Sequence, residues 1–182
     1  MPLLDRHDCV LVVVDAQPGF LPAGDADECV ARIGWLVAVA GVLAIPVVVT
    51  EEEPERNGAT DPRVGAAATA FRKPTFGLAA TPEILAAVEA TGRRTAVLVG
   101  AETDVCVAQS AIGLHDAGFS CVVVDDATFS PGEMHERGLA RIAAEGIGRN
   151  HAKGVTYEWL RTVDDARAVL RDPALREPPF AL

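Results

Sequence analysis

The chain has 182 residues, 49% of them hydrophobic, and a formal net charge of −10. This length suits one domain with a full core, and we expect a single domain over residues 1–182. The acidic balance disfavours nucleic acid and anionic membranes as partners. No apolar run reaches the about 20 residues of a membrane helix, and the start shows no signal peptide, so we expect a cytoplasmic protein.

Four short apolar runs, rich in β-branched residues, indicate strands. Hydrophobic residues fill them almost continuously, which is typical of strands buried on both faces of a parallel sheet. The runs span residues 9–14, 45–50, 95–99 and 121–124.

Helical spacing of apolar residues separates and follows these runs. The predicted helices span 26–43, 82–91, 104–117, 133–145 and 163–172, and residues 154–158 are predicted as a last strand. The alternation predicts an α/β fold: a three-layer sandwich with an open, mainly parallel sheet of about five to six strands and helices on both faces. The stretch 51–80 is predicted as a long irregular loop, which in a compact domain is often functional.

The four cysteines form no CxxC pair and have no histidine at metal-ligand spacing. In the cytoplasm we expect them to be reduced. Cys9, Cys29 and Cys121 are interpreted as small buried apolar side chains. Cys106 differs because of its place in the predicted fold.

Three reactive side chains map to one edge of the predicted sheet. Asp15 follows the first strand, Lys73 lies in the loop after the second strand, and Cys106 comes one short turn after the third. Ligands of open parallel sheets bind beyond the carboxyl ends of the strands. Taken singly, these residues are a turn former, a solvated lysine and a core thiol; together they favour a site.

The combination suits acyl transfer through a thioester. If Thr103 caps the following helix, Cys106 lies in its first turn, where the helix dipole and Lys73 would lower the pKa of the thiol. Asp15 could accept the thiol proton and later hand it to a leaving group. Backbone N–H groups at the start of the helix could stabilise an oxyanion.

Several segments, in order, resemble one known family. They are "LVVVDAQPGFL" around Asp15, "VVVTEEEP" at the second strand, "KPTFG" from Lys73, "VGAETDVCVAQSA" around Cys106, and "AGFSCVVVDDA" over 117–127. In these the chain is similar to the isochorismatase-like cysteine hydrolases, which include nicotinamidases and related amidases. The match spans most of the chain.

The resemblance implies a catalytic triad of Asp15, Lys73 and Cys106. It also implies a cis peptide bond between Ala101 and Glu102, which would turn backbone N–H groups toward the oxyanion. Members of the family are commonly homo-oligomers, so we expect a dimer or tetramer.

The chain departs from nicotinamidases after the second strand. They carry an Asp/His metal cluster there, whereas "TEEEPERNGATDPRV" contains no histidine. We therefore expect neither a metal nor another cofactor, and a substrate other than nicotinamide. Carboxylates of the run 51–53 could bind a hard cation, but such runs are more often solvated. Enzymes acting on the vinyl ether of isochorismate generally lack the cysteine, so Cys106 favours C–N or related acyl bonds.

Four further residues are candidates for the wall of a small-molecule pocket: Gln17, Phe20, Phe76 and Thr103. Turn formation and core packing explain Gln17 and Phe20 equally well. Phe76 could instead anchor its loop, and Thr103 could serve only as a helix cap. Gly77, where the family often has serine, would give a wider or more mobile wall.

Three other functions compete with a hydrolase. One is a catalytically idle small-molecule binding or scaffold protein on the same fold, which would have no need of all three triad residues. A thiol redox sensor would favour a resolving cysteine near Cys106, yet Cys121 starts the next strand at the opposite end. A phosphoaspartate domain would need a second acidic residue beside Asp15, where the chain has Ala16 and Gln17.

Overall fold

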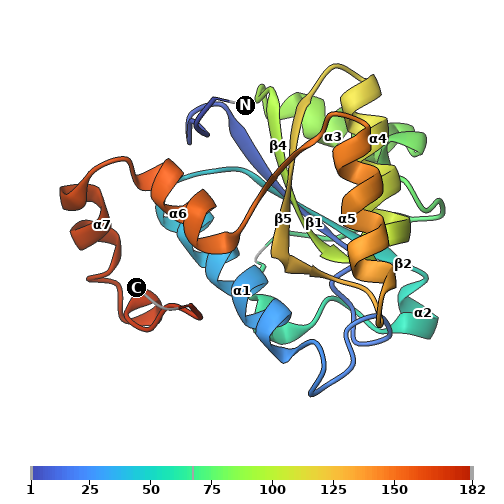
Figure 1. Ribbon diagram of the computed structural model, residues 1–182, viewed down its shortest axis with the longest axis horizontal. Coiled ribbons are helices and arrows are strands. Elements are labelled where there is room, and N and C mark those ends of the chain that lie inside the picture. Colours follow the sequence, from blue (N-terminus) through green and yellow to red (C-terminus); the bar gives the residue numbers. More distant parts are fainter. Residues whose placement is uncertain (1, 67, 181–182) are drawn as a thin grey trace.

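A computed structural model describes residues 2–66 and 68–180 (Figure 1). Its centre is an open sheet of six parallel strands in the order β3-β2-β1-β4-β5-β6. The strands are β1 (Cys9–Val14), β2 (Val47–Glu52), β3 (Phe71–Lys73), β4 (Thr95–Ala101), β5 (Ser120–Phe129) and β6 (Gly148–Asn150). The predicted fold class is confirmed.

Helices cover both faces of this sheet, as Figure 1 shows. They are α1 (Asp27–Val42), α2 (Pro54–Asn57), α3 (Pro82–Ala90), α4 (Ala108–Asp116), α5 (Met134–Ala144), α6 (Ala152–Leu160) and α7 (Val163–Val169). Helices α1 and α6 pack on one face, and α3, α4 and α5 pack on the other. A π-helical turn, Thr103–Val107, precedes α4 directly.

Strand β1 shows why the apolar runs lack alternation. All of its side chains are buried. Leu11 and Val13 face the core under α1, while Val10, Val12 and Val14 face the core under α4. Because successive side chains of a strand point to opposite faces, a strand covered on both sides must be apolar throughout.

Two predictions of secondary structure are wrong. Residues 154–158, predicted as a strand, lie inside α6, where Val155 and Trp159 are buried four residues apart on one helix face. The predicted loop 51–80 contains α2 and the edge strand β3. A three-residue strand at a sheet edge is too short to leave an apolar pattern in the sequence.

None of the helices in the described part of the chain is both long enough and apolar enough to cross a membrane.

Candidate active site

The fold brings Asp15, Lys73 and Cys106 together at the carboxyl edge of the sheet. Lys73 Nζ lies 2.9 Å from Asp15 Oδ2 and 3.7 Å from Cys106 Sγ. Asp15 and Lys73 are 0% exposed, and Cys106 is 3% exposed. Three segments far apart in the sequence thus supply a carboxylate, an ammonium and a thiol that touch one another out of contact with bulk water.

Asp15 is positioned by the strands on either side of β1. Its backbone adopts a φ of 46°, and the Thr50 hydroxyl donates a hydrogen bond of 2.7 Å to Oδ1. On the other side, a Cβ atom at Gly100 would lie 1.8 Å from the Val14 carbonyl oxygen. Gly100, with a φ of 122°, therefore lets β4 pass close to the end of β1.

Lys73 is the last residue of β3, and its ammonium is held by several acceptors. Nζ donates hydrogen bonds to the carbonyl oxygens of Thr75 (2.6 Å) and Phe76 (2.8 Å), in addition to its ion pair with Asp15. A buried charge is tolerated only when it is paired and hydrogen-bonded in this way. The turn after β3 therefore fixes the position of the ammonium.

Cys106 lies in the π-helical turn that opens α4. The N–H groups of Val105 and Val107 both donate to the Glu102 carbonyl oxygen, and the peptide bond between Ala101 and Glu102 is cis. The prediction that Thr103 caps this helix is wrong. The capping position is Glu102, and the Thr103 hydroxyl instead contacts His135 Nδ1 of α5 at 2.9 Å.

The pKa of the Cys106 thiol is raised, contrary to the predicted lowering. Burial and the charge of Asp15 raise this pKa to about 12, against the opposing effects of Lys73 and of a hydrogen bond from the Glu102 backbone N–H. The helix start and the ammonium do not outweigh burial beside a carboxylate. Burial also raises the pKa of Asp15, against the charge of Lys73. The Cys106 thiol and the Asp15 carboxyl group thus share one proton and one negative charge, and the Lys73 ammonium balances that charge.

The two oxygens of Asp15 have different partners. Oδ1 accepts the hydrogen bond from Thr50, and Oδ2 forms the ion pair with Lys73 at 2.9 Å. The Cys106 side chain also hydrogen-bonds to this carboxylate. A carboxylate in contact with a thiol has the geometry for exchanging a proton with it.

Gln17 and Phe20 make structural contacts. The Gln17 amide group is fully buried, donates to the carbonyl oxygens of Glu52 (3.0 Å) and Gly58, and accepts from the Glu52 N–H (2.8 Å). Phe20 packs against the core under α1. Phe76 is 56% exposed, and its carbonyl oxygen accepts a hydrogen bond from Lys73.

Thr50, Thr75 and His135 contact triad or pocket residues, but the sequence analysis did not select them. For Thr50 a signal was present: it ends the second apolar run, next to the first run in a parallel sheet, and it pairs with Val14 in the structure. His135 lies 32 residues from Thr103, and no local pattern could have joined the two.

The three glutamates of the run 51–53 have separate roles. Glu51 Oε1 accepts from the N–H and hydroxyl of Thr60, Glu52 Oε2 accepts from Asn57 Nδ2, and Glu53 forms an ion pair with Arg56. Across residues 2–66 and 68–180, no group of three or more His, Cys, Asp or Glu side chains is arranged to hold a metal ion.

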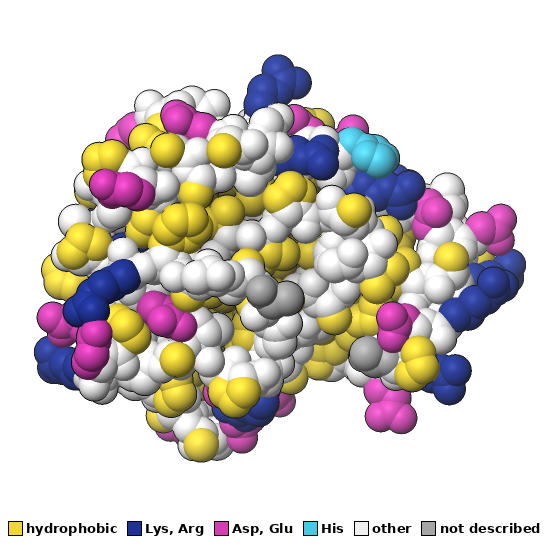
Figure 2. Space-filling model, turned by 180° about the vertical axis from the view of Figure 1, so that it is seen from behind, with side chains coloured by type: hydrophobic (Ala, Val, Ile, Leu, Met, Phe, Trp, Pro, Cys, Tyr) yellow, Lys and Arg dark blue, Asp and Glu magenta, His cyan; other side chains and the backbone are white. Residues whose placement is uncertain are grey.

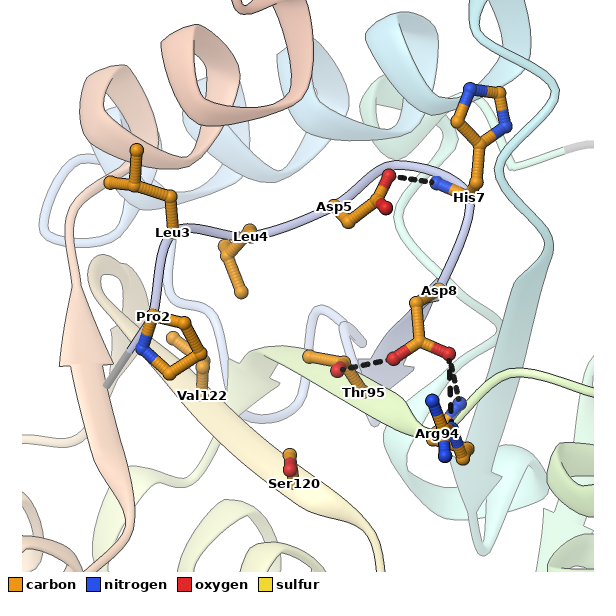
Figure 3. Close-up of a pocket in the computed structure, with 10 residues that line it drawn as sticks. All are labelled: Pro2, Leu3, Leu4, Asp5, His7, Asp8, Arg94, Thr95, Ser120 and Val122. Carbon is orange, nitrogen blue, oxygen red and sulfur yellow. Dashed lines mark hydrogen bonds and ion pairs between the residues drawn. The ribbon is translucent and has the colours of Figure 1, made fainter.

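A pocket of about 340 Å³ lies at the opposite, amino edge of the sheet (Figure 3). Charged groups in this pocket join the starts of two strands. Asp8, just before β1, forms an ion pair with Arg94 and accepts a hydrogen bond from the Thr95 hydroxyl at the start of β4. The triad and this pocket are thus at opposite ends of the strands.

Comparison with known proteins agrees with this architecture. The family model described as "Isochorismatase domain" matches residues 9–148. "Isochorismatase domain-containing protein 1" of Danio rerio is 37% identical over 143 residues, which are 76% of this chain and 50% of that protein. The chain thus spans about half the length of the curated relatives from Danio rerio and Salmo salar that it matches.

Two solved structures share the fold over nearly the whole chain. The YcaC gene product of Escherichia coli, described as an octameric hydrolase of unknown specificity, has a TM-score of 0.85 at 24% identity and covers 97% of this chain and 94% of its own. YcaC from Pseudomonas aeruginosa, described with hexane-2,5-diol and covalent acrylamide, has a TM-score of 0.81 at 26% identity and covers 95% and 93%. The chain belongs to the isochorismatase family and has the fold of its hydrolases.

Proposed function

We propose that the protein is a cysteine hydrolase that cleaves a C–N (amide-type) or related acyl bond of a small molecule. Asp15, Lys73 and Cys106 are its catalytic residues. The observation that carries the proposal is the buried contact of one ammonium with both a carboxylate, at 2.9 Å, and a thiol, at 3.7 Å. A merely structural lysine, already held by Asp15 and two carbonyl oxygens, would not need a thiol as its fourth neighbour.

In the first half of the reaction, Asp15 takes the proton from the Cys106 thiol as Sγ attacks the acyl carbon. A new S–C bond forms, and the π electrons of the carbonyl group move to oxygen. Because the resting thiol is neutral, proton transfer and attack occur together. The proposal assigns stabilisation of the oxyanion to two backbone groups: the Glu102 N–H, which hydrogen-bonds to Cys106, and the Cys106 N–H at the helix start.

Collapse of this intermediate breaks the C–N bond. The leaving amine takes the proton from Asp15, and a thioester remains on Cys106. Water then attacks the thioester while Asp15 accepts a proton from it, the C–S bond breaks, and the proton returns to the departing thiolate. Lys73 stays charged throughout and keeps Asp15 in place, so the chemistry uses only groups of the chain and water.

The Pseudomonas structure adds support, since acrylamide is a small neutral amide and is described there as covalently bound. A reactive nucleophile in the same fold is what the proposal requires of Cys106.

The test is ammonia release from a panel of small primary amides, with mass spectrometry of the intact protein after rapid acid quenching. We expect turnover and an acyl adduct in the wild type, neither in Cys106→Ala, and both in the control Cys121→Ala, whose thiol is also buried. Turnover that survives Cys106→Ala would overturn the assignment. Tight amide binding without turnover in the wild type would instead favour a binding protein.

We also propose that the protein is a cytoplasmic homo-oligomer. Seen from behind, its surface carries a broad group of hydrophobic side chains (Figure 2). Exposed apolar patches of this kind mark interaction surfaces, and the Escherichia coli neighbour is described as octameric. Light scattering after size exclusion would give the mass; a mass near the 19.1 kDa of one chain would refute this proposal.

A further inference from the structure

The turn that carries Cys106 is open to control by the residues that pack against it. It is a π-helical turn, Thr103–Val107, and such turns are rare and occur mostly at functional sites. Glu102, at its capping position, makes no capping hydrogen bond with its side chain. The position of Cys106 therefore depends on contacts that reach the turn from other elements.

Helix α5 packs directly on the first two residues of this turn. Figure 1 shows α5 beside α4, the helix that the turn opens. A Cβ atom at Gly138 of α5 would lie 2.7 Å from Asp104 Cα and 2.9 Å from the Thr103 carbonyl carbon. Only glycine allows so close an approach, so the backbones of α5 and the turn are in contact.

Two side chains at the start of α5 and just before it add hydrogen bonds to the same two residues. His135 Nδ1 and the Thr103 hydroxyl share a hydrogen bond of 2.9 Å, and the Ser130 hydroxyl donates one of 2.6 Å to Asp104 Oδ1. Thr103 is 0% exposed, and within residues 2–66 and 68–180 its hydroxyl has His135 as its one hydrogen-bond partner. Removal of the imidazole would leave that buried hydroxyl unpaired, which is unfavourable.

We propose that His135 is a positioning residue, which acts through Thr103 to hold the Cys106 thiol in contact with Asp15 and Lys73. In the part of the chain that the structure describes, His135 makes no hydrogen bond or ion pair with these three residues. Thr103 and Cys106 lie three residues apart in one turn, so a shift of Thr103 moves the thiol. This inference rests on the proposed function, which needs the thiol beside both charged groups.

The first test follows alkylation of Cys106 by iodoacetamide at pH 8, read by peptide mass spectrometry. Cys106 and Cys121 are 3% and 5% exposed, and Cys121 lies at the start of β5, where its labelling reports on unfolding of the whole domain. His135→Ala should speed up labelling of Cys106 on the order of tenfold, because the turn opens locally, and should leave Cys121 unchanged. His115→Ala, which removes an exposed imidazole in the last turn of α4, should change neither rate.

Two further variants show whether the effect passes through the hydrogen bond. The amide of His135→Asn can take the place of Nδ1, so this variant should label Cys106 at close to the wild-type rate. Thr103→Val removes the hydroxyl and keeps the shape of the side chain, and should act like His135→Ala. The double variant Thr103→Val/His135→Ala should be no faster than either single variant, because both changes remove the same bond.

Four results would overturn the inference. They are unchanged labelling of Cys106 in His135→Ala, equal acceleration of Cys121, no recovery in His135→Asn, and additive effects in the double variant. Equal acceleration of Cys121 would show that His135 serves only the stability of the whole domain.

Amide turnover separates this inference from the proposed function. With the best amide of the panel, His135→Ala should lower kcat on the order of tenfold or more with little change in KM, and His135→Asn should recover most of the loss. An unchanged kcat in His135→Ala would overturn the positioning role and leave the hydrolase proposal intact. If the wild type hydrolyses no amide, the hydrolase proposal fails, while the labelling rates still decide whether His135 holds the thiol in place.

Discussion

Asp15→Asn should affect the reactivity of the Cys106 thiol and the turnover in opposite directions. The substitution keeps the shape of the side chain and removes its charge. Lys73 Nζ lies 3.7 Å from Sγ. At an effective dielectric constant of about 20, that separation gives an attraction of about 4 kcal/mol between the ammonium and a thiolate. In the wild type, the carboxylate 2.9 Å from Nζ offsets much of this attraction.

Without that carboxylate, the thiolate becomes the counter-ion of Lys73. The pKa of Cys106, raised to about 12 in the wild type, should therefore fall. We expect the inflection of the alkylation rate to move to lower pH by about two to three pH units. Turnover should nevertheless drop by about 10²- to 10⁴-fold, because no general base remains to move the proton to the leaving group.

Iodoacetamide labelling of the Cys106 peptide from pH 6 to 11 measures the first effect, and ammonia release from the best amide of the panel measures the second. The double variant Asp15→Asn/Lys73→Met is the control, since removal of the ammonium should move the inflection back to higher pH. Slower or unchanged labelling of Asp15→Asn, or retained turnover, would refute the reasoning.

Three further predictions concern stability, measured as the free energy of unfolding in urea. Gly34→Ala should destabilise the protein, because the new Cβ would lie 2.6 Å from the Arg63 carbonyl oxygen. Gly41→Ala in the same helix places a Cβ with nothing within 4 Å and should stabilise the protein by up to about 1 kcal/mol. Equal effects of the two substitutions would contradict this prediction. Burial raises the pKa of Cys121 from 9.0 to about 12, so the stability from its neutral form is present below pH 9 and lost toward pH 12, at about 1.4 kcal/mol per pH unit. Cys121→Ala should show a flatter decline from pH 8 to 11, and an unchanged slope would count against a buried neutral thiol. Lys73→Met should cost about 3–5 kcal/mol at pH 8, because it leaves a buried carboxylate unpaired. That loss should shrink at pH 5, where the carboxyl is more readily protonated, and the same loss at both pH values would argue against the ion pair.

The sequence alone determined the fold class and the edge of the sheet that carries the proposed site. Apolar runs without alternation required strands covered on both faces, and the helices between them required parallel connections. Once the strands are parallel, residues that follow them, such as Asp15 and the turn before Cys106, must meet at one edge. These conclusions need only the order and spacing of residue types along the chain.

The tertiary structure decided what depends on contacts between distant segments. Lys73 reaches Asp15 and Cys106 because residues 71–73 of the predicted loop pair with β2 as a strand. Gln17 has a structural role because its side-chain amide donates hydrogen bonds to the backbone carbonyl oxygens of Glu52 and Gly58. The pKa of Cys106 was predicted to be lowered, but it is raised because burial beside Asp15 outweighs the local helix start. The burial and the electrostatic environment of a site depend on all residues that lie close to it in space. The spacing of residues along the chain does not specify which residues these are.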